Sequence, residues 1–169
     1  MFAVGANSTA IMAALPNMRT ELVLSSAGVE WAVNAYLVVS AAFIVLGGQA
    51  ADRFGARPAS MVGLALFGVA SCIIAIADTP AALLAGRTLQ GFAAAFAVPC
   101  TLAAVDTSAV PERRAAAIGA WTGFLMLGFS IGPLLGGALT HITGWRAIFW
   151  LNALLMLVAI AGMASAGLA

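Results

Sequence analysis

The sequence predicts an all-α membrane protein, and three observations support this fold class. Hydrophobic residues make up 63% of the 169 residues and charged residues only 8%, whereas a soluble domain is about half apolar and about a quarter charged. The mean hydropathy is +1.08. Apolar residues also gather in long runs separated by Pro, Gly and charged residues. Because a helix needs about 20 residues to cross the hydrocarbon core of a bilayer, these runs predict spanning helices.

Six apolar segments predict six transmembrane helices in chain order. They cover about residues 1–16, 31–51, 59–77, 81–105, 115–140 and 147–169. Five are long enough to cross a bilayer, and the first is short enough to suggest that several residues of its span are missing. A cleaved signal peptide is the alternative interpretation of the first segment, although no basic residue precedes it and no convincing cleavage site follows it.

The distribution of basic residues predicts the orientation in the membrane. The connections after the second and fourth spans hold four arginines and the opposite set holds two: Arg53, Arg57, Arg113 and Arg114 against Arg19 and Arg146. By the positive-inside rule the first set is cytoplasmic, which places both termini in the cytoplasm. On the other side, Trp31, Tyr36 and Trp145 lie near span ends, as aromatic residues that anchor a helix at the interface do.

The residues that usually carry metal, redox or catalytic chemistry are scarce. Cys72 and Cys100 lie in apolar runs without a CxxC partner, and His141 is the only histidine. We therefore expect no metal, no cofactor and no enzymatic activity, and an intramembrane enzyme finds no support. The net charge of +1 gives no reason to expect a nucleic-acid partner.

Small residues in the fifth span predict close helix contacts. Gly119 and Gly123 are four residues apart, and so are Gly128, Gly132 and Gly136. Each set forms a groove on one helix face where another backbone can approach, although simple packing is the alternative explanation for the glycines alone. Pro133 removes one backbone hydrogen bond at that depth and favours a bend.

Three stretches at related places in consecutive spans together resemble the signature motifs of the major facilitator superfamily. They are GQAADRFGARP from Gly48, LLAGRTLQGFAA from Leu83 and GFSIGPLLGGAL from Gly128. The third is similar to the antiporter motif, carried here by Gly128, Gly132, Pro133, Gly136 and Gly137. WAVNAYLVVSAAF from Trp31 and GWRAIFWLN from Gly144 are similar to the fourteen-span drug/proton antiporters in particular.

The resemblance implies one half-bundle of a major-facilitator-type fold, since members consist of two six-helix bundles with substrate between them. It further implies a secondary active transporter in the bacterial inner membrane that exports small molecules or drugs in exchange for protons. The second bundle is absent from this chain, so a C-terminal half of six to eight spans or a second copy would have to supply it. The alternatives are a half-size, non-transporting scaffold or regulator, and a truncated fragment that is inactive by itself.

The loop motif implies a gate at the cytoplasmic end. It comprises Gly48, Asp52, Arg53, Gly55 and Arg57. Gly48 permits close helix approach, and Arg57 can pair with the Asp52 carboxylate. Asp106 at the end of span four is expected to join this charge cluster. A charged turn that only obeys the positive-inside rule is the alternative.

Arg87 predicts a substrate or proton pathway, because a charge inside a membrane helix is costly and needs a partner. It lies about 10 Å inside span four, with Gln90 on the same helix face. A polar stripe of this kind suits a cavity wall, although snorkelling to the surface is the alternative. The resemblance places a carboxylate on span one opposite this arginine, where the sequence has Asn7, and an asparagine where it has Met12. Since Asn7 cannot titrate, proton coupling would need another carboxylate.

Overall fold

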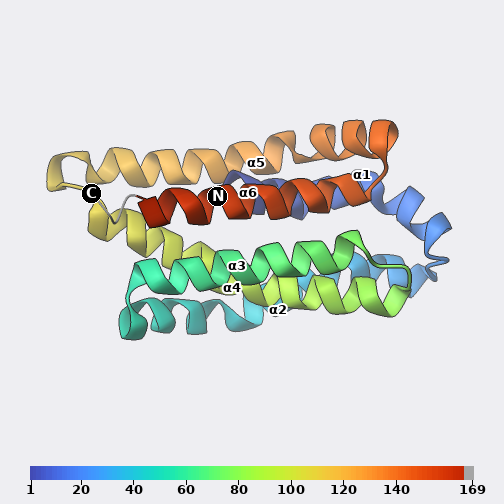
Figure 1. Cartoon of the computed structure of the whole chain (residues 1–169), viewed down its shortest axis with the longest axis horizontal. Coiled ribbons are helices and arrows are strands. Elements are labelled where there is room, and N and C mark those ends of the chain that lie inside the picture. Colours follow the sequence, from blue (N-terminus) through green and yellow to red (C-terminus); the bar gives the residue numbers. More distant parts are fainter. Residues whose placement is uncertain (166–169) are drawn as a thin grey trace.

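The computed structural model describes residues 1–165 and consists of six long helices in that range (Figure 1). They are α1 (Phe2–Glu21), α2 (Ser26–Phe54), α3 (Ala56–Ala75), α4 (Pro80–Ser108), α5 (Arg114–Thr143) and α6 (Arg146–Ser165), with a short 3-10 helix η1 (Pro111–Arg113) before α5. The predicted all-α fold is confirmed. All helices except α1 are long and apolar enough to cross a membrane.

Most helices extend beyond the predicted apolar segments, because the helical backbone continues into polar residues that flank each apolar run. The Ser25 hydroxyl caps α2 by accepting a hydrogen bond from the Gly28 amide, and Thr79 caps α4 through the Ala82 amide. Gly55 ends α2 with φ +90°, a conformation that favours glycine. The first segment does not stop at Pro16, since α1 continues through it to Glu21. Residues 166–169 of the last segment lie outside the described residues.

The helices form two groups, with α1, α5 and α6 on one side and α2, α3 and α4 on the other (Figure 1). The most extensive contacts join α1 to α5, α2 to α4, and α3 to α4, while α3 and α6 connect the groups. Two large buried apolar clusters fill most of the interior, one around Ile11, Phe149 and Trp145 and one around Phe67 and Tyr36, and a smaller third consists of Ala51, Ala59 and Cys100. Tyr36 and Trp145 are thus core residues and not the interfacial anchors that the sequence suggested.

Three glycines of the antiporter motif allow a close contact between α1 and α5. A methyl group at Gly128 would lie 2.7 Å from the Ala6 amide nitrogen, and one at Gly136 would lie 2.8 Å from the Ala10 Cα. Gly132 likewise faces the Ala6 backbone. Gly137 makes only an ordinary contact with Ala13, and Pro133 is exposed.

Other glycines differ from the expectation. Gly48, Gly119 and Gly123 have no atom within 4 Å of an added methyl group among the described residues. The close approach predicted for Gly48 belongs to its neighbour Gly47, where a methyl group would lie 2.8 Å from Pro99. The reason is rotational, since adjacent residues on a helix point in different directions and only one of them faces α4.

Candidate functional site

Arg87 is completely buried inside the bundle. Its Nε donates to the Ala32 carbonyl at 2.8 Å, its Nη1 donates to Gln90 Oε1 at 2.6 Å, and its guanidinium lies 4.6 Å from the Tyr36 ring centroid. The third nitrogen, Nη2, has no hydrogen-bond partner in the structure. Within this six-helix bundle Arg87 is covered by Ala32 and Tyr36 of α2 and does not face an open cavity, and its place in a substrate or proton pathway stays a prediction.

Gln90 is the centre of a polar network around Arg87. Its Oε1 accepts hydrogen bonds from Arg87 and from Asn7 Nδ2 at 3.2 Å, and its Nε2 donates to Ser71 Oγ at 2.9 Å. Asn7 Oδ1 accepts in turn from Asn152 Nδ2 at 2.8 Å. We call these residues, Arg87, Gln90, Asn7, Ser71 and Asn152, the Gln90 network. Together with the Ala32 and Tyr36 contacts of Arg87, it joins α1, α2, α3, α4 and α6.

The sequence analysis predicted that Arg87, Gln90 and Asn7 belong to one site, but it did not identify Ser71 and Asn152. Asn152 stands alone as a polar residue within the apolar run IFWLNALLM, which is the signal that points to a buried partner. Met12, which the resemblance placed near this site, is 54% exposed on α1 and takes no part in the network.

No carboxylate belongs to the Gln90 network. The acidic residues of the described chain lie at helix ends or in turns, at Glu21, Glu30, Asp52, Asp78, Asp106 and Glu112. The positive charge of Arg87 is instead met by a backbone carbonyl, an amide oxygen and the electron-rich face of Tyr36. This arrangement can hold the charge in place, but its neutral amides cannot take up and release a proton.

The loop motif lies at the end of the bundle that we call the Arg57 end. Arg57 Nη2 donates to the carbonyls of Met163 and Ala164, where the dipole of α6 is negative. Asp106 forms an ion pair with Arg114 across the turn from α4 to α5, and Arg53 lies 5.5 Å from the Phe54 ring centroid. The expected cluster of Asp52, Arg57 and Asp106 is absent from residues 1–165, because nearer partners satisfy Arg57 and Asp106.

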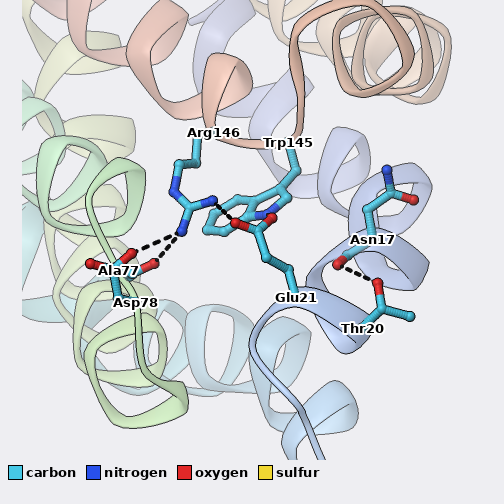
Figure 2. Close-up of polar contacts among 7 residues, drawn as sticks. All are labelled: Asn17, Thr20, Glu21, Ala77, Asp78, Trp145 and Arg146. Carbon is cyan, nitrogen blue, oxygen red and sulfur yellow. Dashed lines mark hydrogen bonds and ion pairs between the residues drawn. The ribbon is translucent and has the colours of Figure 1, made fainter.

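A second charged cluster lies at the opposite end, the Arg146 end, and sequence reasoning did not single it out. Figure 2 shows the Arg146 guanidinium between α1 and the α3–α4 turn. It donates to Glu21, to the Ala77 carbonyl at 2.8 Å and to Asp78 Oδ1 at 3.1 Å. Trp145 Nε1 donates to the second Glu21 oxygen at 2.6 Å. These donors lower the pKa of Glu21, chiefly through the Arg146 hydrogen bond.

Comparison with known proteins assigns the chain to one family, and the relatives agree with that assignment. The family model described as Major Facilitator Superfamily matches residues 1–167. The chain is 37% identical to the methylenomycin A resistance protein of Bacillus subtilis (strain 168), over 85% of the chain and 31% of that protein. It is 35% identical to the tetracenomycin C resistance and export protein of Streptomyces glaucescens, over 88% of the chain and 28% of that protein.

A third similarity concerns the cephamycin export protein CmcT of Amycolatopsis lactamdurans, which is 36% identical over 89% of the chain and 31% of the relative. The three matches thus cover 28–31% of the relatives' own lengths. They say nothing of the remaining two thirds of those proteins.

Proposed function

Because the chain belongs to the major facilitator superfamily, we propose that it forms the N-terminal six-helix bundle of a secondary active transporter that exports small molecules or drugs. The observation that carries this proposal is the match over nearly the whole chain to proteins named for antibiotic resistance or export. Transporters of this kind bind substrate between two bundles, so the bundle contributes one wall of the pathway.

The second wall comes from a C-terminal half or from a second copy of the chain. Reading the coding sequence on from Ala169 is the first test, and it shows either further spans or a stop codon. The chain alone and the complete reading frame are then expressed in a drug-sensitive bacterium, and efflux of a fluorescent drug is measured. We expect efflux from the form that contains two bundles. A membrane-inserted two-bundle form without efflux of any tested compound contradicts the proposal and favours the scaffold or regulator.

We further propose that export is coupled to protons through a carboxylate outside the Gln90 network. Support comes from the neutral Asn7 and from the position of all described acidic residues at helix ends or in turns. Asn7→Asp introduces an acid beside Gln90 and Arg87, so it is expected to change the number of protons moved per substrate or the pH dependence of export. Asn17→Asp makes the same change at an exposed position of α1 and serves as the control. Identical coupling in Asn7→Asp and the parent means that the position of Asn7 has no part in coupling, whereas export by the parent without any proton movement contradicts the proposal.

A further inference from the structure

An apolar groove lies between α3 and α6, which run side by side in Figure 1. It encloses about 340 Å³ and is lined on α3 by Leu64, Gly68, Cys72 and Ile76 and on α6 by Met156 and Ile160, among others. Leu64 and Met156 form a buried floor, each 3% exposed, whereas Ile76 at the rim is 65% exposed. No ionisable side chain other than the Cys72 thiol faces the groove.

The surface around the groove is purely apolar. Between Met61 and Ala75 and between Trp150 and Gly162, the exposed residues are Val62, Ala65, Val69, Trp150, Leu154, Leu157, Val158, Ala161 and Gly162. The exposed faces of α2 and α5 differ, since they carry Asn34, Gln49, Thr122 and Ser130 together with the uncovered Gly119 and Gly123. Polar and small residues at membrane depth suit contact with another helix, whereas an unbroken apolar surface suits lipid.

The length of the groove matches one leaflet of a bilayer. From Leu64 to Ile76 the α3 axis rises about 18 Å at 1.5 Å per residue, and half of the hydrocarbon core is about 15 Å. The groove reaches the turn that carries Ala77 and Asp78, at the Arg146 end, where α3 stops and lipid head groups are expected. It is therefore placed along the path of a chain that descends from the head-group region toward the bilayer centre.

We propose that the α3–α6 groove binds one acyl chain of a phospholipid from the leaflet at the Arg146 end. The groove continues the lipid-facing surface of a multi-pass membrane protein, and its walls offer dispersion contacts without any polar group that water or a head group would be needed to satisfy. Because an acyl chain is already out of water in the bilayer, only better packing favours the groove, so the preference over other lipid positions is modest. The occupied groove would fill the space between α3 and α6.

The test uses the full chain in vesicles of phosphatidylethanolamine and phosphatidylglycerol that contain a small fraction of phosphatidylcholine with a photoactivatable diazirine on one acyl chain. After illumination, lipid adducts are mapped to residues by mass spectrometry. We expect adducts per residue on the groove walls to exceed those on the exposed face of α5 by about threefold. Cys72→Phe fills the groove and is expected to remove this excess. Val62→Phe adds the same ring to an exposed position of α3 outside the groove and is expected to keep it.

Equal labelling of the groove and of α5, or an excess that survives Cys72→Phe, overturns the proposal. If Cys72→Phe does not fold, the folded parent chain is alkylated at Cys72 with an N-alkyl maleimide and then illuminated. Cys100 is fully buried and is expected to stay unmodified. Alkylation of Cys72 is then expected to remove the excess of lipid adducts on the groove walls, as Cys72→Phe would.

Discussion

At the residue scale, the position of Arg87 is explained by its contacts within the bundle. Arginine at the centre of a membrane helix costs about 2.5–3.5 kcal/mol on insertion scales, so a buried one needs compensation. Here the Ala32 carbonyl, the Gln90 amide oxygen and the Tyr36 ring supply it, without a carboxylate. Arg87 and Gln90 are both 0% exposed, and in this arrangement their hydrogen bonds hold α1, α2, α3 and α4 together.

Gln90→Leu tests the Gln90 network. The change removes the acceptor shared by Arg87 and Asn7 and leaves a buried charge poorly satisfied, so the free energy of unfolding in detergent is expected to fall by about 3 kcal/mol. Gln90→Glu keeps an acceptor and is expected to lose less. Thr88→Val alters an exposed neighbour and is expected to stay within about 0.5 kcal/mol of the parent. A Gln90→Leu chain as stable as the parent contradicts the assignment.

The Glu21 carboxylate makes the Arg146 end sensitive to acid. Its pKa is lowered from an ordinary value of 4.5 by Arg146 and Trp145. A lowered folded-state pKa means that the stabilisation is complete above about pH 4.5 and disappears as the pH falls through the folded-state pKa. Because the Glu21 side chain is 48% exposed, we expect a contribution of at most about 1 kcal/mol.

The measurement is the midpoint temperature of unfolding between about pH 6 and pH 3. The parent is expected to lose stability across the acid part of this range, and Glu21→Gln is expected to flatten that part of the curve. Glu30→Gln, at an exposed position of α2, is the control and is expected to follow the parent. Parallel curves for Glu21→Gln and the parent would exclude the role of Glu21.

At the element scale, the contact of α1 with α5 depends on the absence of side chains on one face of α5. The spacing of Gly128, Gly132 and Gly136 predicted a groove, and the structure identifies α1 as the helix that lies in it. The same spacing at Gly119 and Gly123 predicted a second groove that no described residue fills. The glycine pattern therefore indicates where a helix can approach, but not which helix does so.

Gly136→Ala and Gly119→Ala separate these two cases. A methyl group at Gly136 collides with the Ala10 backbone, so we expect a loss of about 1–3 kcal/mol in the free energy of unfolding. A methyl group at Gly119 meets open space, and the greater helix propensity of Ala is expected to add about 0.5–1 kcal/mol when the chain is measured alone. Thermal unfolding in detergent measures both. Equal effects of the two substitutions would contradict the assigned contact.

At the scale of the whole molecule, the two ends of the bundle carry different charges. The Arg57 end holds four arginines, Arg53, Arg57, Arg113 and Arg114, beside Asp52, Asp106 and Glu112. Within residues 1–165, the Arg146 end holds only two, Arg19 and Arg146, beside Glu21, Glu30 and Asp78. The positive-inside rule then places the Arg57 end in the cytoplasm. We propose this orientation, and the location in the bacterial inner membrane, as hypotheses that a labelling experiment tests.

Ser108→Cys and Ser25→Cys, each in a chain whose natural cysteines are replaced by serine, place a thiol at an exposed position of either end. In intact bacterial cells without an outer-membrane barrier, a membrane-impermeant maleimide is expected to label Ser25→Cys. Ser108→Cys is expected to react only after the inner membrane is opened. The opposite pattern reverses the proposed orientation, and labelling of both thiols in intact cells contradicts a membrane-spanning bundle.

The sequence by itself determined the fold class, the family and the number of helices, because apolar run length and motif order are properties of the chain alone. It also brought Arg87, Gln90 and Asn7 to a common depth, since rise per residue is fixed in a helix. Partners were decided only by the tertiary structure. The rotation of each helix about its axis decided that Gly47, and not Gly48, contacts α4. It also decided that Arg57 hydrogen-bonds to α6 and that Asp106 pairs with Arg114. Asn152 and Ser71 joined the Gln90 network for the same reason. Such choices depend on how side chains far apart in the sequence compete for the same space and the same hydrogen bonds.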